Sequence, residues 1–252
     1  GLSGQTDPRR CEWTLPAPSW SRLTKEAGHP GAHIRDGGAM SQDTVIPWFH
    51  IHKTADTSIL LCEKNEISEQ TVEETEPMMK PYRNRSTTWD YRSASALIYE
   101  AFTRYGIPLD SYRESETGRP YIAGSQADFS VSHSGHYTVV AITSNPELSI
   151  GIDIEEIERA RKRNISGIAK RFFPEKEFIR VRDSEDPTIE FLNLWTQKEA
   201  RMKALRVPLA QTLRENGTES AAPAGDFHNK EDFMYMASKN YVMTTCFLRP
   251  KQ

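Results

Sequence analysis

The stretch Ser149-Ile150-Gly151-Ile152-Asp153-Ile154-Glu155 predicts the β-strand around which the rest of the fold is organised. Its isoleucines alternate with Gly151, Asp153 and Glu155, and side chains on a strand point alternately to opposite faces. The strand is therefore expected to have one isoleucine face and one face that carries both carboxylates. The plain alternative is that Asp153 and Glu155 form the solvent-exposed face of a half-buried strand.

A third carboxylate, Glu199, lies in a predicted helix whose residues 195–203 read Trp-Thr-Gln-Lys-Glu-Ala-Arg-Met-Lys. At about 100° per residue, Glu199 falls near the middle of an apolar stripe formed by Phe191, Leu192, Trp195 and Met202. A carboxylate in that position is costly unless something pairs with it.

A hard divalent cation would explain all three carboxylates, because such a cation takes oxygen ligands. We therefore interpret Asp153, Glu155 and Glu199 as ligands of one metal ion and expect Lys203, one turn after Glu199, to face a phosphate. The alternative for Glu199 and Lys203 is an ordinary helix-stabilising pair at i and i+4, worth a few tenths of a kcal/mol.

Composition excludes several classes of protein. The chain has 252 residues, a net charge of −3 and a mean hydropathy of −0.65, which disfavour a strongly basic nucleic-acid binder and indicate a soluble protein. We expect no transmembrane helix and no secretory signal. Cys11, Cys62 and Cys246 are too widely spaced for a disulfide framework or a metal knuckle, so a cytoplasmic location is the simplest expectation.

The chain divides into three parts. Residues 1–39 are rich in proline and glycine and show no periodicity, so we expect a disordered extension or a non-native leader; the alternative is a regulatory arm. The remainder mixes strand and helix patterns, which predicts an α+β fold. Strands are expected within 45–61, at 129–132, at 137–142, at 148–155 and at 241–248. Helices are expected at 89–105 and within 164–205, whereas 214–230 is polar and turn-rich.

Further candidates suit phosphate oxygens. Ser132 and His133 lie where a predicted strand enters a glycine-containing turn, and hydroxyl, imidazole and backbone N–H groups there suit a phosphate. The alternative is a turn that satisfies its own backbone. Arg119 and Arg92 are candidate phosphate partners, although each taken alone is more often a surface arginine.

A basic run covers residues 159–182, with nine Lys or Arg residues against two glutamates. Such a run is either a solvated helix face or a dock for an acidic partner. No aromatic interleaving supports nucleic acid as that partner.

Together these motifs resemble the 4′-phosphopantetheinyl transferase superfamily, and its larger, monomeric Sfp-type branch in particular. The resemblance rests on five segments in order: Gly118-Arg119-Pro120-Tyr121, 129–135 (Phe-Ser-Val-Ser-His-Ser-Gly), 151–155, Arg171-Phe172-Phe173 with Glu177, and Trp195, Lys198, Glu199, Ala200, Lys203 and Ala204 on the predicted helix. Each motif is weak alone, but five in the right order are specific. The match runs from about residue 92 to residue 213.

The resemblance implies two similar α+β halves in a pseudo-twofold arrangement, which we place at 40–145 and 146–252, with coenzyme A between them. It implies transfer of the 4′-phosphopantetheine arm of coenzyme A to a serine hydroxyl of an apo acyl or peptidyl carrier protein, with Mg²⁺ as cofactor and release of 3′,5′-ADP. The enzyme would act as a monomer in the cytoplasm, with neither nucleic acid nor membrane as a partner.

The resemblance also implies roles for individual residues. Asp153, Glu155 and Glu199 would hold Mg²⁺, Lys203 would neutralise the bridging phosphates, and either glutamate would take the proton of the serine. The remaining candidates would contact coenzyme A: Ser132 and His133 its phosphates, and Arg119 and Arg92 its nucleotide end with the 3′-phosphate.

The sequence departs from the family after Lys203, where Arg206 and Pro208 replace two usual glycines. The departure puts the geometry of this loop in doubt but leaves every charged candidate in place. Two rival functions follow: a non-catalytic relative that binds coenzyme A or the carrier, and a basic interaction protein whose carboxylates are only structural.

Overall fold

The computed structural model describes residues 49–53, 56–83, 85–115, 118–207, 213 and 230–249. Within them the chain is α+β, as the sequence predicts. The predicted extension at 1–39 and most of the turn-rich stretch 214–230 lie outside the described residues, and the division at residue 145 stays a prediction.

The first half of the described chain builds a four-stranded antiparallel sheet in the order β1-β2-β6-β5, a small β3-β4 hairpin and two helices. The bounds are β1 His50–Lys53, β2 Thr57–Glu63, α1 Glu69–Met79, α2 Trp89–Arg104, β3 Tyr112–Glu114, β4 Pro120–Ile122, β5 Asp128–Ser134 and β6 Tyr137–Thr143. Helix α2 matches the predicted helix at 89–105 closely, and Gly106 with a φ of 65° follows its end.

The second half builds a three-stranded antiparallel sheet in the order β7-β9-β8 and four helices. The bounds are β7 Ser149–Glu156, α3 Ile157–Arg161, α4 Ile165–Phe172, α5 Glu175–Arg182, α6 Pro187–Leu205, β8 Lys230–Ala237 and β9 Tyr241–Arg249. Helix α6 begins where the Asp186 carboxylate accepts hydrogen bonds from the backbone N–H groups of Thr188 and Ile189, with Pro187 in the first turn.

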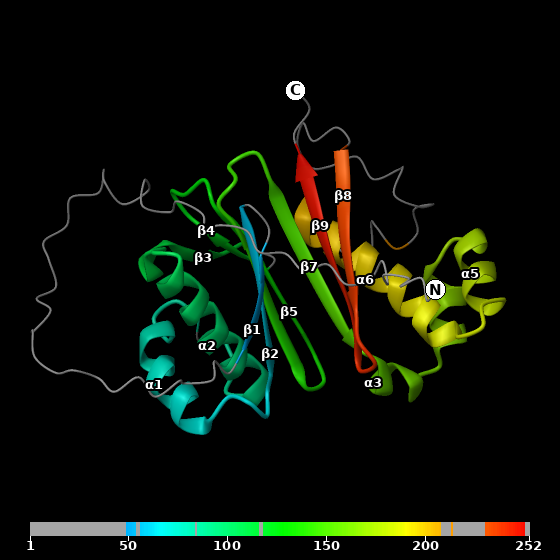
Figure 1. Cartoon of the computed structure of the whole chain (residues 1–252), viewed down its shortest axis with the longest axis horizontal. Helices are drawn as coiled ribbons and strands as arrows, with labels where there is room; N and C mark the ends of the chain where they lie inside the picture. The colour runs from blue at the N-terminus through cyan, green and yellow to red at the C-terminus, as the bar shows by residue number, and fades with distance from the viewer. Residues whose placement is uncertain are drawn as a thin grey trace, which may run out of the picture.

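The elements form layers, with α1 and α2 on one side, the strands in the middle and α6 on the other side (Figure 1). The first sheet packs one face on α2 through residues such as Leu97 and Phe102. Its other face meets the isoleucine face of β7, where Ile152 packs with residues such as Val139 and Ile59. The first sheet thus covers one face of β7 and α6 covers the other, so most of β7 is buried on both faces.

Helix α6 packs against the other face of β7 at very short range, and Gly151 is the reason. A Cβ atom added to Gly151 would lie 1.9 Å from the carbonyl oxygen of Ala200 and 2.5 Å from the backbone nitrogen of Ala204. Only a residue without a side chain lets the helix backbone come this near to the strand. The same face of β7 carries Asp153 and Glu155, so these carboxylates point toward α6 and not toward solvent.

Aromatic side chains hold α6 to α4 and α5. Phe173 stacks on Phe191 with ring centroids 5.2 Å apart, and Phe191 stacks on Trp195 at 5.4 Å. Beside them the Lys198 ammonium lies 2.9 Å from the Glu177 carboxylate. Phe173, Glu177 and Lys198 therefore form one packing unit with α6.

Three details differ from the predictions. The sequence analysis did not anticipate β8, which pairs with β9. Ser132 and His133 lie inside β5 and not in the turn, because β5 continues to Ser134 and only then reaches Gly135, whose φ is 53°. Helix α6 has buried residues on several sides, so Glu199 lies half-buried beside β7 and not on a single apolar stripe.

Among the described residues, no helix is long and apolar enough to cross a membrane.

The close approach at Gly151 gives a stability prediction. Gly151→Ala should lower the free energy of unfolding by about 3 kcal/mol, at the upper end of the usual cost of overpacking, because the clashing atoms belong to the helix backbone and cannot rotate away. Chemical denaturation measures the change. Gly167→Ala in α4 is the control: its Cβ would meet only the side chain of Asn164, at 2.7 Å, so it should cost much less. Equal costs for both variants would contradict the proposed constraint.

Candidate functional site

The three predicted metal ligands lie on facing elements, β7 and α6, near enough for their charges to affect one another. Asp153 and Glu155 project from β7 toward the helix, and Glu199 and Lys203 lie one helical turn apart on α6. The Lys203 ammonium lies 2.7 Å from Oδ1 of Asp153 and donates to the carbonyl oxygen of Ile152 at 3.0 Å. A simple surface pair of Glu199 and Lys203 does not account for these contacts, because Lys203 also binds Asp153 and Ile152 on the strand.

The carboxylates influence one another strongly. Burial raises the pKa of Glu199 to about 7, and the negative charge of Asp153 adds to the effect, while Lys203 opposes it. Burial and the charge of Asp153 also raise the pKa of Glu155. Three acids thus share one region with the ammonium group of Lys203, and the guanidinium of Arg163 also acts on Glu155, so the carboxylates outnumber the nearby cations.

One oxygen of Asp153 has no partner. Asp153 is 4% exposed, and its Oδ2 is buried without a hydrogen-bond partner among the described residues. A buried acceptor of this kind is costly unless something fills the site. Oxygen ligands, excess negative charge and an unpartnered carboxylate oxygen all fit a hard divalent cation. Even so, nowhere in the described part of the chain are three or more His, Cys, Asp or Glu side chains gathered into a ready metal-binding geometry.

Strands β5 and β7 lie side by side without a backbone ladder, and side chains join them instead (Figure 1). We call this join the seam. It comprises the alternate β5 residues Asp128, Ser130, Ser132 and Ser134. The carboxylate of Asp128 accepts from the N–H of Ile150 at 3.0 Å, the hydroxyl of Ser130 from that of Ile152 at 3.1 Å, and the hydroxyl of Ser134 from that of Glu156 at 3.2 Å.

The seam also contacts two of the predicted metal ligands. The Ser132 hydroxyl donates to Oδ1 of Asp153 at 2.7 Å, and the Ser134 hydroxyl donates to Oε2 of Glu155 at 2.7 Å. The sequence predicts a phosphate contact for Ser132 and gives no role to Ser134. Alternating polar residues along β5 could have pointed to both, since they share one face of the strand.

His133 points away from the seam, as strand alternation requires. Its ring is half exposed, and its Nδ1 lies 4.0 Å from the Asp90 carboxylate. Asp90 in turn pairs at 2.7 Å with Lys64, a buried lysine that also donates to the carbonyl oxygen of Gly135. Burial and the charges of Lys64, Lys203 and Arg83 lower the pKa of His133. The surroundings of His133 are thus cationic apart from Asp90, which suits a phosphate.

The two predicted arginines have different surroundings. Arg119 lies at the seam, 3.6 Å from Asp128 and 3.4 Å from the carbonyl oxygen of Ile150, so it is next to the strand that bears the metal ligands. Arg92 pairs with Glu76 of α1 at 3.0 Å and approaches Glu69 at 4.0 Å. The structure therefore brings Arg119 to Asp128 and Ile150 at the seam, whereas ion pairs hold Arg92 against α1.

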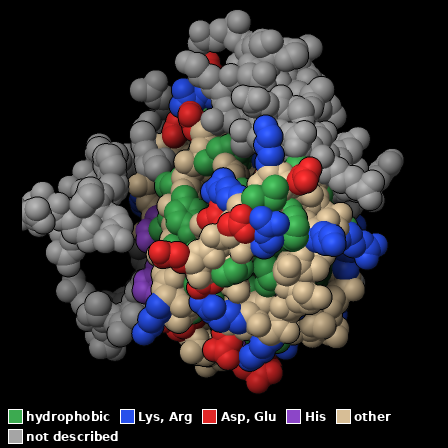
Figure 2. All heavy atoms as spheres, turned by 90° about the vertical axis from the view of Figure 1, so that its right-hand side faces the viewer, with side chains coloured by type: hydrophobic (Ala, Val, Ile, Leu, Met, Phe, Trp, Pro, Cys, Tyr) green, Lys and Arg blue, Asp and Glu red, His purple; other side chains and the backbone are tan. Residues whose placement is uncertain are grey.

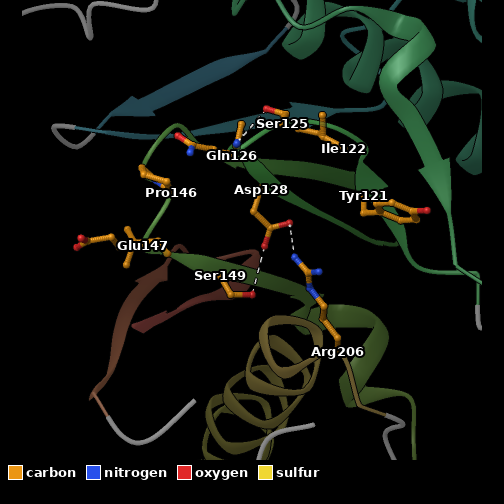
Figure 3. A pocket seen from close by; sticks show the side chains of 11 residues that line it. Tyr121, Ile122, Ser125, Gln126, Asp128, Pro146, Glu147, Ser149 and Arg206 are labelled. Atoms are coloured by element: carbon orange, nitrogen blue, oxygen red, sulfur yellow. Dashed lines mark hydrogen bonds and ion pairs between the residues drawn. The ribbon is translucent and has the colours of Figure 1, made fainter. Parts of the chain in front are cut away.

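A shallow cavity of about 320 Å³ opens at the end of the seam, between the β4–β5 connection and the start of β7 (Figure 3). Arg206 and Ser149 both reach Asp128 at its wall, at 3.5 Å and 3.3 Å. Arg206 ends α6 in the left-handed conformation with a φ of 61°, the only such non-glycine residue in the described chain. The substitution at the usual glycine thus keeps the glycine-like backbone turn; Pro208 lies outside the described residues.

Much of the basic run is paired internally. The pairs join Arg161 to Asp186, Lys162 to Glu158, Arg180 to Glu190, and Arg182 to Asp183. Figure 2, which views the side of the molecule that carries α5, shows basic and acidic side chains intermixed with hydrophobic ones. Within the described part of the chain, Lys170, Arg171 and Lys176 are exposed and make no ion pair.

Comparison with known proteins connects this site to a family. Residues 149–246 match the family model described as the 4′-phosphopantetheinyl transferase superfamily. The chain is 32% identical over 150 residues to a 4′-phosphopantetheinyl transferase of Bacillus subtilis, which covers 56% of this chain and 64% of that protein. It is 30% identical over 149 residues to the transferase Sfp of Bacillus subtilis strain 168, covering 55% and 63%.

A more distant match extends to animals. The chain is 31% identical over 125 residues to the human L-aminoadipate-semialdehyde dehydrogenase-phosphopantetheinyl transferase, covering 44% of this chain and 40% of that protein. The chain thus spans slightly less than two thirds of the length of the Bacillus relatives that it matches. The matched region contains β7 and α6 with all three carboxylates and Lys203, so the part of the chain that carries the site is similar to the 4′-phosphopantetheinyl transferase superfamily and to its Sfp-type members.

Proposed function

We propose that this protein transfers the 4′-phosphopantetheine arm of coenzyme A to a serine hydroxyl of an apo acyl or peptidyl carrier protein. The observation that carries the proposal is that Asp153, Glu155, Glu199 and Lys203 face one another across β7 and α6, in a region similar to this superfamily. In the reaction the serine oxygen forms a bond to the phosphorus that bears pantetheine. The bond from that phosphorus to the bridging oxygen breaks, and 3′,5′-ADP leaves.

Asp153, Glu155 and Glu199 would hold Mg²⁺, whose charge would be set against the diphosphate of coenzyme A. The fit of these residues to a cation rests on the unpartnered Oδ2 of Asp153 and on the mutual repulsion of the carboxylates. Lys203 would neutralise the bridging phosphates, and its ammonium group already lies on the Asp153 side of the site. Preorganised charge of this kind is a major part of catalysis of phosphoryl-type transfer.

The serine proton needs an acceptor within the site. Glu155 and Glu199 both have raised pKa values, and that of Glu199, at about 7, lies close to the pH at which a general base is most effective. We therefore assign Glu199 as the first candidate and Glu155 as the second. His133 and Arg119 would receive phosphates of the donor, because one lies among cationic side chains and the other lies at the seam. We further infer that the protein acts as a monomer, since both walls of the site come from one chain.

The experiment that tests the proposal is incubation of the full chain with apo-carrier, coenzyme A and Mg²⁺, followed by intact-mass measurement of the carrier. The carrier should gain one phosphopantetheine group and 3′,5′-ADP should appear in equal amount. Lys203→Ala and Glu199→Gln should each lower the rate at least about 100-fold, as for other groups that stabilise charge in the transition state. Glu100→Gln, on the surface of α2, should leave it unchanged. Binding of coenzyme A without release of 3′,5′-ADP would instead indicate a non-catalytic relative.

The pKa of Glu199 predicts how the metal-free protein responds to pH. Because folding raises this pKa from 4.5 to about 7, the folded state holds the proton more tightly than the unfolded chain. Stability is therefore lost as the pH rises from about 5 to 8. We expect Tm to fall by several degrees over this range, to fall less in Glu199→Gln, and to recover when Mg²⁺ is added at pH 8. Thermal unfolding with and without EDTA measures this.

The comparison between wild type and Glu199→Gln removes the contribution of any other group that titrates in the same range. An identical pH profile for the two proteins would mean that Glu199 is not protonated near neutral pH.

The exposed basic residues predict how the carrier is recognised. The carrier proteins that such transferases modify are typically acidic around the modified serine. Lys170, Arg171 and Lys176 would therefore steer the carrier toward the site by electrostatic attraction. Replacing all three with glutamate should raise KM for the carrier about tenfold and leave KM for coenzyme A nearly unchanged. The difference should shrink at high salt, because exposed charges are screened.

Lys53→Glu on β1 is the matched control for an exposed charge elsewhere. If the triple variant changes both KM values equally, or neither, then the basic run is only a solvated surface.

A further inference from the structure

The hydroxyl groups of the seam have more than one use. A strand edge in the protein interior must satisfy its backbone N–H groups, and Ser130 does only that, by accepting from Ile152. Ser134 accepts from the N–H of Glu156 and in addition donates its own hydrogen to Oε2 of Glu155. Ser132 donates to Oδ1 of Asp153. Ser134 therefore holds a side chain as well as the strand, and Ser132 holds a side chain.

The bond made by Ser132 has a chemical consequence. A hydroxyl group has a single hydrogen, and in this arrangement that hydrogen goes to Asp153. Phosphate oxygens only accept hydrogen bonds, so the Ser132 hydroxyl has nothing to donate to them here. Ser132 is also only 8% exposed. Its contacts point to the carboxylate and not to a donor molecule.

Each serine binds one particular oxygen of its carboxylate and leaves the other oxygen free of that bond. Oδ1 of Asp153 receives both the Ser132 hydroxyl and the Lys203 ammonium, each at 2.7 Å, while Oδ2 is the atom without a partner. On Glu155 the Ser134 hydroxyl takes Oε2 only. Each carboxylate is thus tied by one oxygen. Rotation about its terminal bond is restrained, and the other oxygen is turned in a fixed direction.

We propose that Ser132 and Ser134 are positioning residues that orient Asp153 and Glu155 so that one oxygen of each is presented to the metal ion. The inference rests on the proposed function, because it assumes that these carboxylates hold a divalent cation. Hydrogen-bonding partners behind metal ligands commonly change metal affinity or activity about 10- to 100-fold when they are removed. Neither serine needs to touch the ion or the donor to have this effect.

The test uses isothermal titration of Mn²⁺, as a divalent probe, into the full chain saturated with coenzyme A. Ser134→Ala should weaken Mn²⁺ binding at least about tenfold. Ser130→Ala is the matched control, since it lies on the same strand and face and contacts backbone but no carboxylate. Both variants lose a partner of one buried N–H group and should show a similar fall in Tm, but Ser130→Ala should keep the wild-type Mn²⁺ affinity.

Ser132→Ala separates the two roles suggested for that residue. If Ser132 positions Asp153, the variant should weaken Mn²⁺ binding while its affinity for coenzyme A without metal stays at the wild-type value. A loss of coenzyme A affinity with unchanged Mn²⁺ binding would overturn the assignment for Ser132 and restore it as a phosphate ligand.

The outcomes also separate this inference from the proposed function. If the wild-type protein binds no Mn²⁺ even with coenzyme A present, the metal site itself is wrong. If the wild type binds Mn²⁺ and both Ser134→Ala and Ser130→Ala bind it equally well, the proposed function stands and the positioning role of Ser134 is wrong.

Discussion

The site depends on how closely α6 approaches β7. At Gly151 the helix backbone occupies the volume that any other side chain would need, and this fixes the height of α6 above the strand. Two residues further along the strand, the same spacing places Lys203 2.7 Å from Asp153. It also lets the charge of Asp153 raise the pKa of Glu199. A wider spacing would let water separate these charges and would weaken their coupling. A residue with no side chain thus determines the electrostatics of its charged neighbours.

Much of this could be predicted from the sequence, because the relevant patterns are local. Alternation in 149–155 gave the strand and the common face of Asp153 and Glu155, and helical spacing placed Lys203 one turn after Glu199. The long helix ending before Gly106 was equally clear, since apolar periodicity and a stop residue agree there. Five motifs in order were enough for the superfamily, which the comparisons support.

The remaining features depend on contacts between distant segments, which no local pattern contains. Ser132 and Ser134 could be seen as polar residues on one face, but their partners lie 21 residues away across the seam. Four of the nine basic residues in the run form ion pairs, and one of them, Arg180–Glu190, requires the folded arrangement of α5 and α6. The sequence predicts Arg92 as a contact of the nucleotide, and its ion pairs with Glu76 and Glu69 could not be predicted because they depend on the packing of α1 against α2.

The seam has a further consequence for how such a protein changes over generations. A backbone ladder depends little on which amino acids form it, so substitutions rarely loosen it. Side chains form the join between β5 and β7. A single substitution at Ser130 or Asp128 therefore removes one hydrogen bond and leaves both strands in place. A shift of the register by one residue would place Val131 or His133 where a hydroxyl is needed. The side chains of the seam therefore fix the register of the two strands. Single substitutions can therefore change the angle and strength of this join one residue at a time.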